Sequence, residues 1–382
     1  MGTVATRMIG GTTPRAAYPS RKRIQTEMLK FAKSDTRKGL TLFLSDYTLY
    51  AGALAGVLLL DALWAKILCS IVTGVKISNL GTLAHDAAHG TLVRGIKANK
   101  WLAMFAFMPG LFNYRLWLYD HHVLHHPKVN GKHRDSFTPF SKAEFDAMPA
   151  QRRWRERLYR APLGLGFGIY YIFERWLGVK IMPRAFMPQR VRRDAWPHFA
   201  FLMAYLALFL TGLALAPLYS STSSATAIIL GFVLPYYIWM MLIGFTLYLQ
   251  HTDPRIPWFD GPVERSQAAP PELVSTHVEF PGWLKVLMHN VYDHAAHHVQ
   301  PRIPVYNLAA AQARLNELMG DRNLKVNFSF GWYADTVRRC KLYDYENRRW
   351  LDFAGNPTSG VLPALDAEGE AALTGGYTAQ SA

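Results

Sequence analysis

The histidines of this chain gather in three short clusters whose spacing suits metal binding. The stretch HDAAHG begins at residue 85, DHHVLHH at residue 120 and DHAAHH at residue 293. Within them, histidines recur at positions i and i+4, or at i, i+3 and i+4, which share one face of a helix. Each cluster therefore presents its imidazoles in one direction. The eight aligned residues are His85, His89, His122, His125, His126, His294, His297 and His298, and His121 lies beside the second set.

These imidazoles have two interpretations. A single buried histidine is usually hydrogen-bonded within a protein core, and one pair four residues apart only weakly indicates a metal site. Three aligned clusters favour metal binding, because neutral imidazole is a ligand for zinc, copper, iron and nickel. A single tetrahedral zinc would be saturated by half of these side chains. The set therefore predicts two metal ions.

Four apolar stretches are available to position the clusters at one side of a membrane. They cover residues 40–64, 67–84, 198–219 and 225–250, and a transmembrane helix needs about 20 mostly apolar residues. The links within the first and second pairs are short, so two antiparallel hairpins are predicted. Nine Lys or Arg residues in the first forty, and many more between 90 and 196, favour cytoplasmic termini and a cytoplasmic central segment.

These features predict an all-α integral membrane fold with four transmembrane helices in two hairpins, a cytoplasmic helical cap and interfacial helices. The interfacial helices are expected in 101–117 and 163–182, where glycine or charge interrupts the apolar residues. The formal charge of +15 then reflects topology, and no nucleic-acid partner is predicted. Three parts are expected: a basic cytoplasmic segment (1–39), the transmembrane domain (40–320), and a cytoplasmic C-terminal segment (321–382) with a flexible tail from about residue 355.

In order and spacing, HDAAHG, HHVLHH and HAAHHVQPRIPVYNL resemble the three histidine boxes of the membrane fatty acid desaturase superfamily. The resemblance extends over about residues 40–320 and is closest to acyl-lipid desaturases of the methyl-end, or omega, type. It implies a non-haem diiron oxidoreductase that uses O2 to introduce a double bond into a fatty acyl chain. The third box begins with His294 where front-end desaturases have Gln, which argues against that subclass.

The resemblance also implies the iron ligands. Eight would be the aligned histidines of the three boxes. A ninth is expected just after the fourth apolar stretch, where His251 of LQHTDP is the matching candidate. His289 of MHN, five residues before the third box, is the alternative.

Acidic residues next to the clusters are candidates for orienting the metal-binding rings. A histidine bound to a metal generally has its second ring nitrogen tied to an acceptor. Asp86, Asp120 and Asp293 adjoin the three clusters, and Asp253 follows His251. The alternative for each is a helix cap or a surface ion pair.

Lys76 lies within the second apolar stretch, about nine residues before His85. An ionisable group at such a depth normally faces the interior of a helical bundle, where it could orient a polar group of the substrate. The alternative is a lysine that reaches along a short span toward the membrane surface.

Reducing O2 needs electrons that two metal ions alone do not store, so an external donor is predicted. The chain has no dinucleotide-binding fingerprint and no haem motif, and Cys69 and Cys340 are its only cysteines. Ferredoxin, or cytochrome b5 with its reductase, would suit as donor. The arginine-rich run QRRWRERLYR (151–160) could dock such an acidic protein or anchor to lipid headgroups. The other expected partners are the bilayer and an acyl-lipid or acyl-thioester substrate.

Two other functions compete with the desaturase. A lipid or carotenoid hydroxylase or ketolase would use the same iron and scaffold, and the histidine boxes do not separate the two reactions. A histidine-rich metal-binding membrane protein or transporter is the more distant alternative. It would carry ionisable residues deep in several spans, whereas here only Lys76 lies deep and the histidines gather at one rim.

Overall fold

Four helical stretches of the computed structural model are long and apolar enough to cross a membrane, which confirms the four predicted spans. The model describes residues 19–132, 135–161, 164–260, 274–320 and 324–362. The spans are α2 (Thr36–Leu59), α3 (Leu63–Ala88), α9 (Gln189–Ala214), and a run of α10 (Ser224–Ile228), the π-helix η5 (Ile229–Val233) and α11 (Leu234–His251).

The predicted bounds of the spans differ from the observed ones because helices continue past their apolar residues. The helix α2 starts four residues earlier than expected, where the Asp35 side chain accepts hydrogen bonds from the backbone of Arg37 and Lys38. The helix α9 begins in the polar stretch QRVRRD. Hydropathy marks only the part of a helix that could lie in the hydrocarbon.

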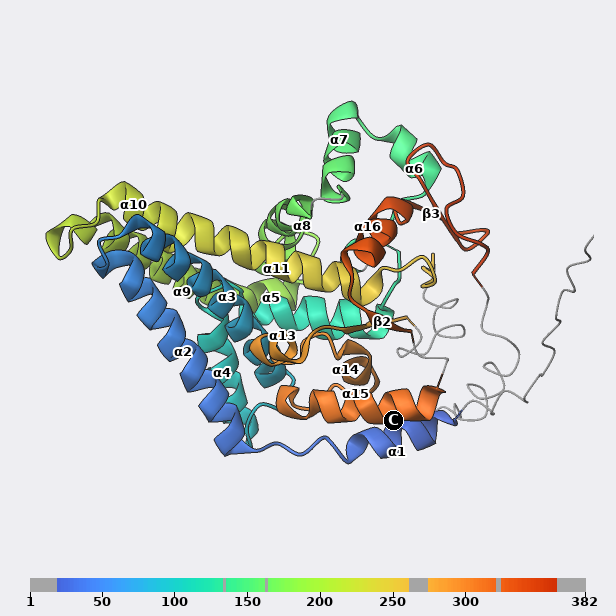
Figure 1. The fold of residues 1–382 in the computed structure, drawn as a ribbon, viewed down its shortest axis with the longest axis horizontal. Helices are drawn as coiled ribbons and strands as arrows, with labels where there is room; N and C mark the ends of the chain where they lie inside the picture. The colour runs from blue at the N-terminus through green and yellow to red at the C-terminus, as the bar shows by residue number, and fades with distance from the viewer. Residues whose placement is uncertain (1–18, 133–134, 162–163, 261–273, 321–323, 363–382) are drawn as a thin grey trace, which may run out of the picture.

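The spans α2 and α11 pack against α3 (Figure 1). Only three residues join α2 to α3, and the two helices pack along each other. The helix α11 also packs against α3, and a Cβ added to Gly74 would lie 2.8 Å from Ile238. The helix α9 meets α10 near their connecting turn, where Leu213 packs with Ala227.

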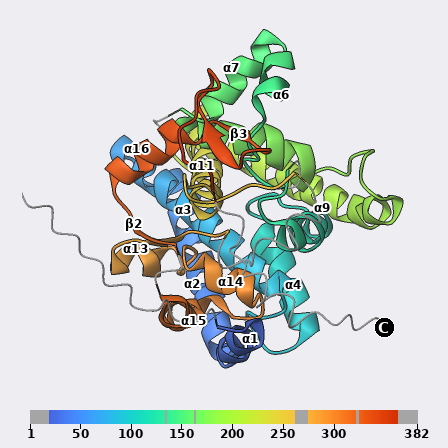
Figure 2. The same cartoon turned by 90° about the vertical axis from the view of Figure 1, so that its right-hand side faces the viewer.

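Most of the shorter helices gather at one end of the spans, whereas η4 lies in the turn between α9 and α10 at the other end (Figures 1 and 2). Among them α14, α15 and α1 lie side by side. The predicted interfacial segments form short helices, and within the described residues only the four spans qualify as membrane-crossing. The shorter helices are α1 (Arg21–Leu29), α4 (Ile96–Phe107), α5 (Tyr114–Leu118), η1 (Tyr119–His125), η2 (His126–Lys128), α6 (Lys142–Ala147), α7 (Ala150–Tyr159), α8 (Leu165–Tyr170), η3 (Tyr171–Lys180), η4 (Ala216–Leu218), α13 (Gly282–Leu287), α14 (His294–Val299), α15 (Val305–Met319) and α16 (Phe330–Arg339).

Two small sheets complete the fold, and the sequence did not predict them. The strand β1 (His277–Glu279) pairs in parallel with β2 (Lys325–Asn327). The strand β3 (Leu342–Asp344) pairs antiparallel with β4 (Arg349–Leu351). Strands of three residues are too short to show the alternating pattern by which a strand is predicted.

Residues 355–362, where the flexible tail was expected to begin, include residues that contact the rest of the fold. The backbone N–H of Thr358 donates to the carbonyl of Trp350 at 2.9 Å, and that of Leu362 to Arg348 at 2.8 Å. The Leu362 side chain packs in a cluster with Trp258 and Trp350. The rest of the expected tail (363–382) and residues 1–18 of the expected basic segment lie outside the described residues.

Candidate metal centre

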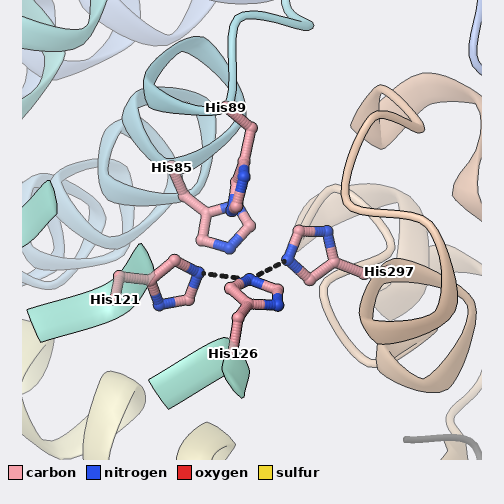
Figure 3. Close-up of side chains that lie close together, drawn as sticks. All are labelled: His85, His89, His121, His126 and His297. Carbon is pink, nitrogen blue, oxygen red and sulfur yellow. Dashed lines mark hydrogen bonds between the residues drawn. The ribbon is translucent and has the colours of Figure 1, made fainter. Parts of the chain in front are cut away.

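Nine histidines converge into two groups, each of which could hold a metal ion. In each group the ring nitrogens that could bind a metal all lie within 4.8 Å of one another. Figure 3 shows the first group, whose rings come from three separate segments and turn toward one another. The groups are His85, His89, His121, His126 and His297, and His125, His251, His294 and His298.

Two helical segments contribute to both groups at once. The helix α14 gives His297 to the first group and His294 and His298 to the second. The segment of η1 and the following His126 likewise contributes to both groups. His121 and His126 belong to the first group, and His125 belongs to the second. The first group is completed by the C-terminal end of α3, and the second by His251 at the last residue of α11. Shared segments place the two groups next to each other, as a two-metal centre requires.

The short distances between ring nitrogens within each group are explained better by a bound metal ion than by hydrogen bonds between the rings. Nε2 of His294 lies 3.0 Å from Nε2 of His251 and 2.8 Å from Nε2 of His298. Nε2 of His126 similarly lies 3.0 Å from His121 and 3.2 Å from His297. One imidazole nitrogen carries either one lone pair or one hydrogen, so it cannot bond well to two facing nitrogens. A metal ion between the rings would satisfy all of these lone pairs.

The surroundings keep these imidazoles neutral, which is the form that binds metal. Burial, reinforced by the neighbouring imidazoles, holds the pKa of His121, His294 and His298 well below the usual 6.5. The same causes lower the pKa of His126 to about 2. At neutral pH these rings therefore carry lone pairs and not positive charges.

The structure brings His121 into the first group and leaves His122 outside both groups, so His122 stays a predicted ligand. Residues 119–125 form a π-helix, and the backbone N–H of His126 donates to the carbonyl of His121, five residues earlier. The prediction assumed α-helical spacing, whereas this wider turn places His121 next to His126. The ring of His122 lies against His89, with centroids 4.4 Å apart, and its buried Nε2 has no hydrogen-bond partner among the described residues. No feature of the sequence marks the π-helix.

Only one of the four predicted orienting carboxylates contacts a ring of the two groups. An oxygen of Asp86 lies 3.3 Å from Nδ1 of His85, and its other oxygen accepts the N–H of Val305. Asp293 instead lies 3.1 Å from Nε2 of His277 and 3.0 Å from Nζ of Lys285. Successive helical residues point about 100° apart, so a residue beside a ligand in sequence turns away from the metal.

Asp120 and Asp253 likewise bind other partners. One terminal nitrogen of Arg175 donates to both oxygens of Asp120, at 2.7 and 2.8 Å, and Asp120 also pairs with Lys180. Asp253 pairs with Arg255 at 2.7 Å and accepts from Nε1 of Trp332 at 3.0 Å. Both carboxylates are therefore held by cations and not by the imidazoles for which they were predicted.

We expect Asp120→Ala to lower the free energy of unfolding by roughly 3–5 kcal/mol, the range for breaking a buried ion pair. Arg175 and Lys180 are themselves largely buried, so the substitution would leave two cations without their shared partner. The check is thermal unfolding of the detergent-purified protein. Asp344→Ala is the control, since that carboxylate lies in a partly exposed pair with Arg349, and an equal loss in both variants would contradict the expectation.

Asp135 orients a ring of the second group, and the sequence analysis missed it. Its Oδ1 lies 2.8 Å from Nδ1 of His125, and the carboxylate also accepts the backbone N–H groups of Asn130 and Ser136. Nε2 of His125 is then left buried, without a hydrogen-bond partner among the described residues. This is the orientation in which His125 would offer Nε2 to a metal.

His251 belongs to the second group, whereas His289 lies outside both groups. Nε2 of His289 lies 2.5 Å from one oxygen of Asp46, and Nζ of Lys76 lies 2.8 Å from the other. Lys76 is buried in the bundle as expected, but its ammonium has a protein partner.

An apolar cavity of about 110 Å³ reaches the histidines of both groups. Residues of α3 and α11 form part of its wall, and most of its surface is apolar, although Ser78, Lys180 and Gln250 also line it. Such a cavity suits an alkyl chain that ends beside the metal site. Its lining includes Phe107, Phe112, Trp117, Tyr171, Ile243 and Leu247, and at the metal end His85, His121, His294 and His297.

Comparison with known proteins agrees with this geometry. Residues 61–330 match the model of a family described as fatty acid desaturase. A chloroplastic omega-6 fatty acid desaturase of Spinacia oleracea is 28% identical over 277 residues, which cover 71% of this chain and 58% of the relative. An sn-1 oleoyl-lipid 12-desaturase of Synechocystis sp. is 27% identical over 280 residues, covering 72% of this chain and 76% of the relative.

A third relative is the sn-1 acyl-lipid omega-3 desaturase (ferredoxin) of Synechocystis sp. It is 25% identical over 288 residues, which cover 74% of this chain and 76% of the relative. The chain spans less than two thirds of the length of the plant relatives. The family match covers most of the chain and all three histidine clusters, so this chain belongs to the fatty acid desaturase family.

Proposed function

We propose that this chain is an O2-dependent diiron desaturase that introduces a double bond into the acyl chain of a membrane lipid. The observation that carries the proposal is the apolar cavity that ends at histidines of both groups. A metal transporter would need a polar route through the spans. Here histidines of both groups line a cavity whose surface is mostly apolar, which supports oxidation of a hydrocarbon.

The reaction removes one hydrogen from each of two neighbouring carbons. In balanced form, R–CH2–CH2–R′ + O2 + 2 e⁻ + 2 H⁺ gives R–CH=CH–R′ + 2 H2O. Iron, when bound, supplies the activation of O2 that lets it attack an unactivated C–H bond. Both irons would be held by the nine histidines of the two groups, and His122 remains a predicted ligand that this geometry does not use.

The residues around the metal centre have separate tasks in this reaction. Asp135 and Asp86 hold the outer nitrogens of His125 and His85, which fixes the rings that face the metals. Phe112, Trp117 and the other apolar lining residues exclude water and hold the alkyl chain beside the centre. The chain's own side chains thus bind, orient and shield, while the electrons come from outside.

The two electrons would come from ferredoxin or from cytochrome b5 with its reductase. The name of one Synechocystis relative includes ferredoxin, which supports the first. The arginine-rich α7 offers less free charge than its sequence suggests, because Arg152 pairs with Glu156 and Glu174, and Arg160 with Glu156. We place the donor, both termini and the metal centre on the cytoplasmic side, as the distribution of Lys and Arg supports.

The test is to express the chain with a ferredoxin system in a host of simple lipid composition. Purified protein should contain two irons per chain, and lipid mass spectrometry should show acyl chains that have lost two hydrogen atoms. Chains that gain one oxygen atom would instead identify a hydroxylase. Stoichiometric zinc without iron would rule out both oxidative reactions.

A further inference from the structure

We propose that residues 282–292, here called the strap, close a side entrance between α3 and α11 through which the acyl chain enters from the bilayer. A membrane lipid, the substrate of the proposed function, could then reach the metal centre without leaving the bilayer, whereas a water-soluble thioester would not need this route. This inference rests on the proposed function. It concerns the route and the carrier of the acyl chain.

The gap that the strap covers is set by the two spans. The helices α3 and α11 touch at Gly74 and Ile238, where there is no room for a Cβ. Nearer their histidine ends they line the cavity, with Thr82 from α3 and Thr246 from α11. The helices therefore meet inside the span and leave a space between them toward the metal centre.

The strap bridges these two helices by polar contacts with its backbone. Asn79 of α3 donates to the carbonyl of Leu287 at 2.8 Å, and Gln250 of α11 donates to the carbonyl of Val291 at 2.7 Å. Between and beside these attachments, Met288 and Val291 line the cavity. One thin segment therefore forms the cavity wall between the two spans.

The outer face of the strap suits lipid and not water. The helix α13 has no buried residue, and its Trp283 and Val286 are 70% and 72% exposed. The strap also lies at the depth of the spans, since His289 contacts Asp46, ten residues into α2. Apolar side chains exposed at this depth would face the acyl chains of the bilayer.

The strap has an exposed part and a packed part. Met288 and Tyr292 are buried in a hydrophobic cluster, whereas α13 has no buried residue, and polar contacts help to hold the strap in place. Asp46 binds His289, and Lys285 lies 3.0 Å from Asp293 at the other side. His289 and Asn290 both have left-handed backbone angles, with φ of 51° and 53°, which residues other than glycine rarely adopt. The α13 part of the strap, which buries no side chain, can therefore move about this turn while Met288 and Tyr292 keep their packing.

The experiment cross-links the strap to α3 so that it cannot open. Asn79→Cys and Leu287→Cys, in a Cys69→Ser background, would join the strap to α3 by a disulfide, or by a short bis-thiosulfonate linker. In the control, Gly56→Cys pairs with native Cys69 and joins α2 to α3 away from the strap. A Cβ at residue 56 would lie 3.4 Å from Cβ of Cys69, close to disulfide geometry. Both proteins are assayed in liposomes, oxidised and then reduced, with cross-linking measured by mass spectrometry.

The oxidised strap variant should lose at least tenfold in turnover of liposome lipid, keep its iron, and recover on reduction. The oxidised control should keep its rate. Equal rates for the cross-linked and the reduced strap variant would show that the acyl chain does not enter beneath the strap. Turnover of a soluble acyl thioester at the rate of liposome lipid would show that the substrate need not be a membrane lipid. If the iron-loaded, reduced protein and the wild type desaturate neither substrate, the proposed function fails instead.

A second pair of variants avoids the cross-link. Val286→Lys would place a charge on the outer face of the strap, and Ile96→Lys is the control because Ile96 is 86% exposed on α4. We expect a severalfold rise in KM for liposome lipid with kcat unchanged in Val286→Lys only. The same KM in both variants would contradict a bilayer-facing strap.

Discussion

Replacing His121 with alanine is expected to remove iron from the first group and to reduce desaturation below detection, whereas His122→Ala should keep most of both. The expectation follows from the π-helix, which turns His121 toward His126 and His297 while His122 lies against His89. Loss of one ligand from a two-metal centre changes the coordination geometry of the metal and so abolishes the reaction that depends on it. Iron per chain and lipid turnover are measured on the same preparations.

Two further variants serve as the positive and negative controls for this comparison. His294→Ala should match His121→Ala, since His294 contacts both His251 and His298 in the second group. His198→Ala removes an imidazole of α9 outside both groups and should retain iron and turnover. The reverse ranking of His121 and His122 would show that residues 119–125 take α-helical spacing when metal is bound.

The sequence predicted the membrane spans well because a bilayer imposes a demand that few soluble structures share. A long apolar run such as 225–250 has few alternatives to crossing the membrane. The polar start of α9 at Gln189 was not predictable in this way, since helical hydrogen bonding continues beyond the hydrocarbon. The strands β1 to β4 and the packed residues up to Leu362 depend on contacts between distant segments, which local patterns do not record.

The candidate metal site was predictable where its helices are regular. Histidines four apart on α3 and three or four apart on α14 do converge, because those segments are α-helical. At η1, where the helix widens, the structure adds His121 to a group and leaves His122 as a predicted ligand outside both. The prediction chose orienting carboxylates by their position beside a histidine in the sequence. Asp120 shows why that rule fails, since its neighbours in space are Arg175 and Lys180.

Asp135→Ala is expected to lower iron affinity or turnover roughly 10- to 100-fold, the usual cost of losing a partner that orients a metal ligand. Without the carboxylate, Nδ1 of His125 loses its 2.8 Å contact, and the ring is free to rotate or to change which nitrogen carries the hydrogen. Asp135→Asn keeps one acceptor oxygen and should lose less. Iron retained after dialysis against a chelator, together with turnover, gives the comparison.

The sharpest control for Asp135 is Asp293→Asn, because proximity in sequence and proximity in space disagree there. Asp293 directly precedes His294, yet its carboxylate lies beside His277 and Lys285 and contacts no ring of either group. The variant should therefore retain iron, although the loss of a buried charge would lower its thermal stability. If Asp293→Asn lost iron as readily as Asp135→Ala, the contact with His125 would not be what fixes the second group. Retention of iron in that variant alone would assign the orienting role to the carboxylate that faces the ring.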